Sequence, residues 1–178
     1  MLIKGLAPLM LVIAGVGPAL AEVKSVTSNG FEVASAATIS APPDRVYAAL
    51  GDIGRWWSPS HTFSRDAANL SIELRAGGCF CEKLKNGGSV EHLTVVYAAP
   101  GVGLRLRGAL GPLQAEGVDG ALSWTLKPAP GGTAVALDYV VGGYIRGGIE
   151  QWAPRVDRVL DEQLQNLKNY VEGKLSPR

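Results

Sequence analysis

The sequence has few of the residues that commonly carry enzyme chemistry. Its 178 residues include two cysteines and two histidines. The cysteines, Cys79 and Cys81, stand one residue apart, so the Cys-x-x-Cys spacing of thiol redox enzymes is missing. No Gly-x-Ser-x-Gly segment occurs, which excludes the nucleophile elbow of α/β-hydrolases. Gly101-Val102-Gly103 precedes a predicted strand instead of opening a helix, so it is not a dinucleotide-binding loop.

An excess of charge of either sign is also missing. The chain carries 17 Lys and Arg against 16 Asp and Glu. Such a neutral surface gives no electrostatic reason to expect nucleic acid or an anionic membrane as a partner. After residue 21, no apolar run is long enough to cross a bilayer. We therefore expect neither nucleic-acid binding nor a membrane span in the mature chain.

The N-terminal residues have the pattern of a secretory signal peptide. Lys4 precedes an uncharged apolar run over residues 6–16, and the small residues Ala19 and Ala21 flank a cleavage point before Glu22. We expect residues 1–21 to be a signal peptide and residues 22–178 to form a single exported domain; the alternative is that the segment remains as an uncleaved anchor. Its location is then the periplasm, or the exterior where there is no outer membrane. A domain of about 157 residues buries a core without cross-links.

Hydrophobic periodicity predicts an α+β fold. Apolar residues alternate in several short segments and recur at helical spacing in two others, one of them at the C-terminus. The predicted strands cover residues 31–39, 70–74 with 79–84, 90–97, 104–110, 121–126 and 133–141, and the helices cover residues 44–57 and the segment from Pro154. We interpret residues 70–74 and 79–84 as two halves of one strand, broken by Gly77-Gly78. The sheet is then antiparallel, with about six to seven strands.

Several segments together resemble a known superfamily. They are residues 41–47 (APPDRVY), 56–59 (WWSP), 74–80 (LRAGGCF), 132–137 (GTAVAL) and the terminal helix. Over residues 31–175 the chain resembles the helix-grip (SRPBCC, START-like) superfamily, which includes START domains, the birch-pollen-allergen fold and polyketide cyclases. It is most similar to homologues of the heat-shock-chaperone ATPase activator. The resemblance implies a curved antiparallel sheet wrapped around the C-terminal helix, with a cavity between them for an apolar small molecule.

The aromatic and polar residues near that implied cavity are the candidate ligand-binding residues. Each of them also suits an ordinary core, so the expectation depends on the resemblance. The candidates are Trp56, Trp57, His61, Phe63, Phe80, Glu82, Tyr97, Leu106, Trp124, Tyr139, Tyr144 and Trp152. The glycine pairs at 142–143 and 147–148 would permit a movable lip beside the last helix.

The Asn86-Gly87 pair predicts a two-residue hairpin turn and with it a register. That register places Glu82 opposite Glu91, and two carboxyl groups so close would raise the pKa of at least one. A protonated carboxyl in the cavity could act as a general acid, which makes Glu82, together with His61, a candidate for catalysis. The alternative is that both glutamates are solvated at the hairpin tip.

The same register places Cys81 opposite His92, with Cys79 on the same face. These three residues could contribute to a zinc site, although the spacing is no standard zinc signature. Alternate residues of a flat strand lie about 6.5–7 Å apart at Cα, at the edge of disulfide geometry. We therefore favour two free thiols over a bridge and expect no metal and no cofactor.

These observations favour a small-molecule-binding protein over an enzyme. The expected ligand is hydrophobic or amphipathic, and the expected protein is a monomer or weak dimer. One alternative is an enzyme of the cyclase or hydrolase kind, in which Glu82 or His61 moves a proton. Another is a protein-interaction module that uses the face with Cys79, Cys81 and His92.

Overall fold

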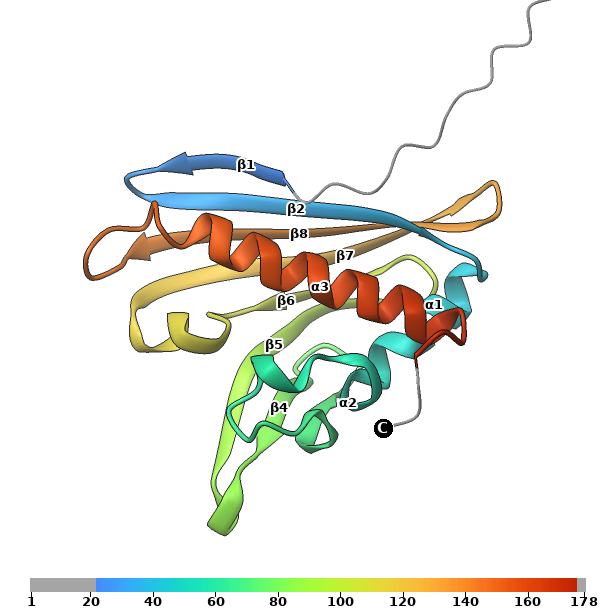
Figure 1. Ribbon diagram of the computed structural model, residues 1–178, viewed down its shortest axis with the longest axis horizontal. Helices are drawn as coiled ribbons and strands as arrows, with labels where there is room; N and C mark the ends of the chain where they lie inside the picture. Colours follow the sequence, from blue (N-terminus) through green and yellow to red (C-terminus); the bar gives the residue numbers. More distant parts are fainter. Residues whose placement is uncertain (1–21, 176–178) are drawn as a thin grey trace, which may run out of the picture.

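A computed structural model describes residues 22–175 of the chain. They form one antiparallel sheet of eight strands in the order β1-β2-β8-β7-β6-β5-β4-β3, with a long helix α3 lying across it (Figure 1). The strands are β1 Glu22–Thr27, β2 Gly30–Ile39, β3 Leu70–Ile72, β4 Cys79–Lys83, β5 Ser89–Ala99, β6 Gly103–Arg107, β7 Gly117–Ala129 and β8 Gly132–Tyr144. The helices are α1 Pro43–Gly51, α2 Ile53–Trp56 and α3 Ala153–Val171, and the 3₁₀ turns are η1 Pro59–His61, η2 Ala67–Asn69, η3 Lys85–Gly87 and η4 Gly111–Ala115.

This architecture confirms the predicted helix-grip fold, with more strands than expected. One additional strand is β1, a fully exposed edge strand paired with β2. The predicted signal peptide, residues 1–21, lies outside the described residues. Within residues 22–175, no helix combines the length and the apolar character needed to span a bilayer.

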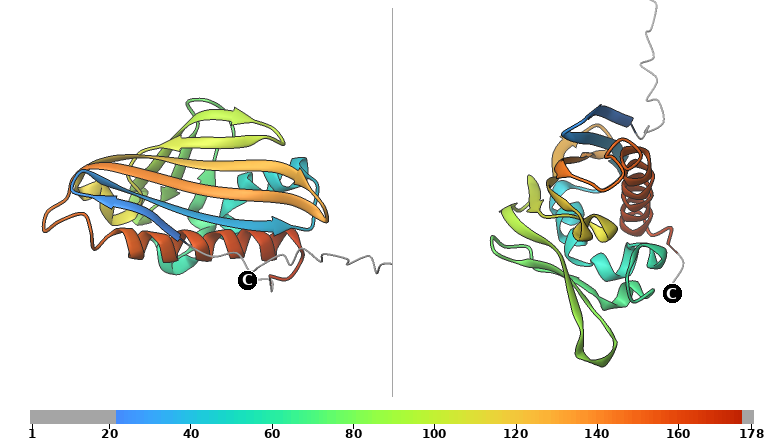
Figure 2. Two further views of the ribbon diagram at one scale, coloured as in Figure 1. Left: turned by 90° about the horizontal axis from the view of Figure 1, so that it is seen from above. Right: turned by 90° about the vertical axis from the view of Figure 1, so that its left-hand side faces the viewer.

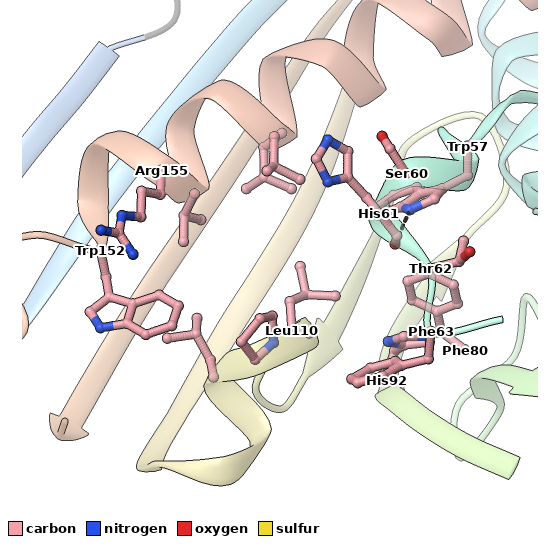
Figure 3. A pocket seen from close by; sticks show the side chains of 16 residues that line it. Trp57, Ser60, His61, Thr62, Phe63, Phe80, His92, Leu110, Trp152 and Arg155 are labelled. Carbon is pink, nitrogen blue, oxygen red and sulfur yellow. Dashed lines mark hydrogen bonds between the residues drawn. The ribbon is translucent and has the colours of Figure 1, made fainter. Parts of the chain in front are cut away.

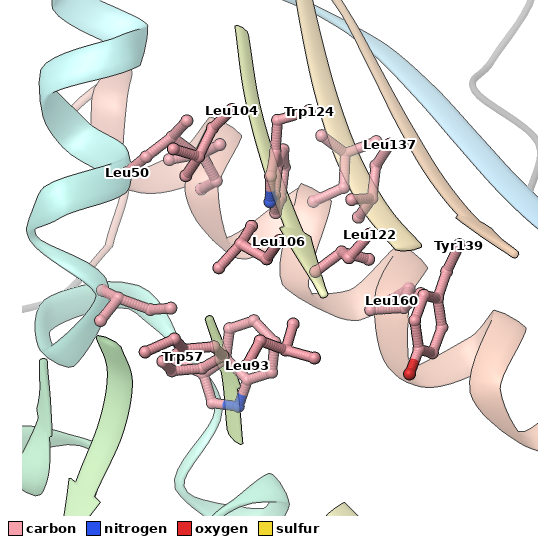
Figure 4. Packing of buried hydrophobic residues seen from close by; sticks show 14 of the residues in the cluster. Leu50, Trp57, Leu93, Leu104, Leu106, Leu122, Trp124, Leu137, Tyr139 and Leu160 are labelled. Atoms are coloured by element: carbon pink, nitrogen blue, oxygen red, sulfur yellow. The ribbon is translucent and has the colours of Figure 1, made fainter. Parts of the chain in front are cut away.

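The central strands obey the alternation seen in the sequence. β2 and β8 pair over ten residues and β7 and β8 over thirteen, both without a shift of register. Every second side chain therefore points to the same face, where Leu122, Trp124 and Leu137 are buried. The apolar stripe of α3, including Leu160 and Leu164, covers that face (Figure 4).

The segment around Gly77-Gly78 differs from its prediction. Residues 70–74 and 79–84 are not halves of one strand, because β3 and β4 run antiparallel and pair with each other from Leu70↔Glu82 to Ile72↔Phe80. The chain reverses at Gly77, whose positive φ of 75° suits glycine, and the Gly78 N–H donates to the Arg75 carbonyl. The glycine pair therefore makes a turn that adds a strand to the sheet.

Helix α3 is tied down at its C-terminal end. Glu172 accepts hydrogen bonds from Lys168, Lys174 and the backbone N–H of Ser40, and these lysine contacts lower its pKa to about 2. Lys168 also donates to the Thr38 carbonyl at 2.6 Å. At the other end Trp152 is the N-cap, and among residues 22–175 no side chain caps the first turn. The contacts of Lys168 and Glu172 fix the C-terminal end of α3 beside the end of β2 (Figure 2).

Candidate functional site

A cavity of about 400 Å³ opens between the first half of α3 and the segments that face it. Its wall is mainly aromatic and aliphatic, with polar side chains near both ends (Figure 3). The lining residues are Trp57, Ser60, His61, Thr62, Phe63, Phe80, His92, Leu110, Gly111, Pro112, Leu113, Trp152, Arg155, Val156, Val159 and Leu160. A cavity of this size holds a small organic molecule.

Five of the twelve candidate ligand-binding residues line this cavity: Trp57, His61, Phe63, Phe80 and Trp152. They come from segments far apart in the sequence. The aromatic rings at 57, 63 and 80 gather at one end, and Trp152 lies at the other, beside the start of α3 (Figure 3).

Four other candidates belong to the solid core instead. Trp56, Leu106, Trp124 and Tyr139 are each at most 4 % exposed and do not line the cavity. Trp56 and Trp124 meet edge-to-face at 6.1 Å, so each fills the space that a ligand would need. The Tyr139 hydroxyl donates to the Gly108 carbonyl at 2.9 Å and accepts from the Leu110 N–H at 3.1 Å. It therefore positions a backbone segment at the cavity wall.

Tyr97 and Tyr144 point away from the cavity, being 45 % and 71 % exposed. The register of β5 against β6 shifts between Val95 and Tyr97, so the extra residue Val96 interrupts the alternation. Tyr97 consequently lies on the outer face, under the Arg105 guanidinium at 5.8 Å. The inward placement predicted for Tyr97 was wrong because the sequence alone does not reveal this bulge.

The predicted register of the β4–β5 hairpin was also wrong. Lys85, Asn86 and Gly87 form a three-residue turn with Asn86 and Gly87 both at positive φ, so Glu82 pairs with Val90 and Cys81 with Glu91. Glu82 points inward as expected and is 0 % exposed, whereas Glu91 is exposed. The Glu82 carboxylate therefore does not face Glu91. It meets His92 at 2.9 Å between Oε2 and Nε2.

The Glu82 carboxyl is held in its ionised form. Burial by itself would raise its pKa, but hydrogen bonds from Ser64, Phe63 and His92 outweigh burial and lower the pKa below the ordinary 4.5. The two backbone donors are the N–H groups of Phe63, at 3.1 Å, and Ser64. The predicted protonated carboxyl is therefore contradicted, and Glu82 does not line the cavity.

The second histidine stands at the mouth of the cavity. His61 Nε2 lies 2.9 Å from Glu162 Oε2 on α3, and both side chains are partly exposed. Burial raises the pKa of Glu162, but hydrogen bonds from Ser58 and His61 reverse that effect and lower it. At the opposite end the Arg155 guanidinium lies 5.9 Å from the Trp152 ring. Both ends of the apolar cavity thus present groups that can pair with a polar ligand end.

Sequence comparison assigns the family. Residues 30–172 match the family described as polyketide cyclase / dehydrase and lipid transport. The chain belongs to this family. The match confirms the resemblance to the SRPBCC superfamily that the sequence motifs indicated. No curated protein is significantly similar to the chain in sequence.

Solved structures share the fold of this polyketide cyclase / dehydrase and lipid transport family member. An uncharacterised protein from Rhizobium leguminosarum matches with a TM-score of 0.59 at 18 % identity, over 88 % of this chain and 99 % of its own. CalU16 from Micromonospora echinospora matches with a TM-score of 0.58 at 18 % identity, over 92 % and 88 %. A conserved protein of unknown function from Enterococcus faecalis matches with a TM-score of 0.59 at 15 % identity, over 89 % of this chain and 80 % of its own. At such identities the likeness establishes the fold alone.

The two cysteines form a disulfide with each other, so the predicted free thiols are contradicted. Their Cα atoms are 5.4 Å apart, closer than in a flat strand, because the β4–β5 pairing is irregular at Phe80 and Cys81. Phe80 and Glu82, which alternate with the cysteines, face His92, so the sulfurs lie on the opposite face of β4. Cys79 and Cys81 therefore lie on one face of the sheet and His92 on the other. This arrangement contradicts both the zinc site and the interaction face that the sequence suggested for these three residues. Within the described residues no three His, Cys, Asp or Glu side chains are grouped to hold a metal.

The sequence interpretation missed most of the aliphatic wall. Val156, Val159 and Leu160 line the cavity from the predicted C-terminal helix, but they are not among the twelve candidate ligand-binding residues. The turn η4 lies between the predicted strands 104–110 and 121–126, and it folds inward and buries Leu113 at 1 % exposure. The leucines on both sides of Gly111-Pro112 were a signal that this turn is buried, because turns exposed to solvent are usually composed of polar residues.

Proposed function

We propose that this protein is exported and binds a small hydrophobic or amphipathic molecule in the cavity beside α3. The observation that carries the proposal is the cavity of about 400 Å³ with its aromatic and aliphatic wall. A ligand burying roughly 300 Å² of apolar surface gains about 7 kcal/mol before the costs of association, which leaves micromolar binding at best. The lipid-transport members of the family support the same class of ligand.

Export is supported by two independent features. The N-terminal residues have the composition of a signal peptide, and the bridge between Cys79 and Cys81 suits an oxidising compartment. The functional unit in this proposal is the single domain of residues 22–178, acting as a monomer or weak dimer in the periplasm or outside the cell.

The first test fills the cavity. The fluorescence of the neutral dye N-phenyl-1-naphthylamine rises when it enters an apolar site, so titration gives its Kd. Val156→Phe adds a ring to the cavity wall, whereas Val140→Phe adds the same bulk on the outer surface of β8, where Val140 is 50 % exposed. We expect Val156→Phe to weaken dye binding at least about tenfold and Val140→Phe to leave it unchanged.

The second test identifies the natural ligand and the compartment. Native mass spectrometry of protein purified from its own host should show a mass above that of the polypeptide starting at Glu22. A full-length polypeptide from the cytoplasmic fraction would contradict export. Absence of dye binding, or equal binding by both variants, would contradict the carrier function.

A further inference from the structure

His92 faces the cavity because of a bulge in β5. Cys81 pairs with Glu91 and Phe80 with Leu93, so His92 is an extra residue between two ladder partners. A bulge lets two consecutive side chains point to the same face, and His92 and Leu93 are both buried, at 5 % and 1 % exposure. The imidazole therefore reaches the cavity wall from a position that unbroken alternation with Leu93 and Val95 would have turned outward.

The imidazole is held in one orientation. Its Nε2 lies 2.9 Å from the Glu82 carboxylate, which itself is fixed by the backbone N–H groups of Phe63 and Ser64. The rings of Phe80 and Phe63 lie against it, with centroids 4.9 and 5.9 Å away (Figure 3). Because an ionised carboxylate only accepts hydrogen bonds, the proton of the neutral imidazole resides on Nε2.

This tautomer leaves a lone pair on Nδ1. Among residues 22–175, Nδ1 of His92 has no hydrogen-bond partner, and it is not one of the polar atoms sealed away without a partner. Since His92 lines the cavity, this nitrogen is available to a bound molecule. Burial lowers the pKa of His92 and outweighs the opposing effect of Glu82, so the neutral imidazole is the main form at neutral pH.

The surroundings of His92 define which proton it could take. Glu82 is its hydrogen-bond partner within the described chain, so the imidazole has no serine, threonine or cysteine to activate. The nearby hydroxyls are engaged elsewhere, since Thr62 donates to the Pro59 carbonyl and Ser60 pairs with Ser58. A base placed in this way acts on the ligand directly.

We propose that His92, positioned by Glu82, is a general base that removes a proton from an activated carbon of an apolar ligand. The C–H proton passes to Nδ1, and the resulting imidazolium is stabilised by the Glu82 carboxylate. The electron pair released from the C–H bond stays in the ligand, either delocalised in its own π system or used to expel a leaving group. The proton then returns to the ligand or to water, so the step needs no further reactant. This activity depends on the same cavity as the proposed ligand binding.

A purely structural role for the pair makes a different prediction. Glu82 and His92 also join the segment around Phe63 to β4 and β5, which would require no reactivity. The Kemp elimination of nitrobenzisoxazole separates the two roles. Removal of its ring C–H proton forms a nitrile, breaks the N–O bond and releases a coloured phenolate, and the probe supplies its own charge delocalisation. We expect the wild-type protein to catalyse this elimination faster than free imidazole does at the same concentration.

Variants of the pair identify the base. His92→Gln should lower kcat by about a hundredfold, within the range of general-base catalysis, while the Kd for N-phenyl-1-naphthylamine stays within about twofold. For the wild type, kcat/KM should rise with pH and level off with a midpoint below 6.5. Glu82→Gln removes the charge that raises the pKa of His92, so the midpoint should move to lower pH. Glu91→Gln, the same change on the exposed neighbour of His92, should move neither rate nor midpoint.

Each contrary result has a definite meaning. Turnover that survives His92→Gln, or that is lost instead in His61→Gln, overturns the assignment of His92 as the base. A wild type that binds the dye but is no faster than free imidazole overturns the catalytic proposal and leaves the carrier function standing. Failure to bind the dye overturns both. If circular dichroism shows that His92→Gln does not fold, the test is the pH dependence of kcat/KM in Glu82→Gln. A midpoint of that curve equal to the wild-type midpoint overturns the proposal.

Discussion

The two halves of the sheet are built by different rules. β2, β8 and β7 pair without interruption, and their inner side chains form a filled core with α3. The pairings of β4 with β5 and of β5 with β6 each contain a shift, and beside them lie the cavity and the buried pair Glu82–His92. Regular alternation thus accompanies a sealed interior, whereas bulges accompany a space with polar groups on its wall.

The difference shows how a sheet obtains a functional wall. In regular pairing the side-chain period of two sends every second residue inward, and a polar residue placed there would disturb the core. A bulge adds one side chain to the inner face, and beyond it the alternation continues with the inward positions moved by one residue, from His92 to Leu93 and Val95. In this protein the inserted side chain is His92, and its partner Glu82 has four hydrogen-bonding contacts that offset its burial, from Phe63, Ser64 and His92.

The largest effect should come from opening the filled half. Leu164 is 0 % exposed on the core stripe of α3, so Leu164→Ala leaves a new cavity and should cost about 3 kcal/mol of unfolding free energy. Val159→Ala, on the same helix but at the existing cavity, should cost less than about 1 kcal/mol. Urea denaturation measures both. Equal losses would show that the two regions are equally well packed.

A smaller effect should follow from removing the cross-link in the bulged half. The disulfide closes a loop of only three residues, so the double change Cys79→Ser, Cys81→Ser should cost roughly 1–2 kcal/mol. Thermal unfolding should show a matching fall in Tm. Reductant should lower the Tm of the wild type by the same amount and leave the double variant unaffected. A wild-type Tm that does not respond to reductant would contradict a bridge that stabilises the fold.

The smallest effect should be the response to mild acid, which reports on His92. Its pKa in the folded protein is lowered from 6.5, so the unfolded chain binds more protons as the pH falls from 7 to 5, and stability declines over that window. Glu82 opposes the burial effect on the pKa of His92, which reduces the decline. Tm measured at both pH values should fall less in His92→Gln than in the wild type. A wild-type Tm that rises toward pH 5 would contradict the sign of this shift.

The same comparison explains which features the sequence could predict. Alternation at Leu122, Trp124 and Leu137 located the central strands, and helical spacing located α3, because burial in that half follows a single period. The family motifs then implied a cavity beside the helix. Five of its wall residues were among the candidates, yet Trp124 and Tyr139 were assigned to the cavity because an inward aromatic residue looks the same in a core and at a ligand.

The candidate site itself was harder to predict because it depends on one-residue shifts. The Asn86-Gly87 pair suggested a two-residue turn, but the turn has three residues, which changed the cross-strand partners of Cys81, Glu82 and Lys83 up to the bulge at His92. A shift of one position moves a side chain to the other face of the sheet. His92 therefore lies on the inner face and contacts Glu82, where the predicted register had placed Glu91. Local sequence does not contain the tertiary contacts that select such a shift.

The unequal fastening of α3 has a mechanical consequence. Its last turn is clamped to Thr38 and Ser40 through Lys168 and Glu172, while its first turn follows a segment that contains Gly147 and Gly148, both at positive φ. We expect α3 to pivot about its C-terminal end when a ligand enters. The N-terminal end, with Trp152, would then move outward while the contacts at the C-terminal end persist.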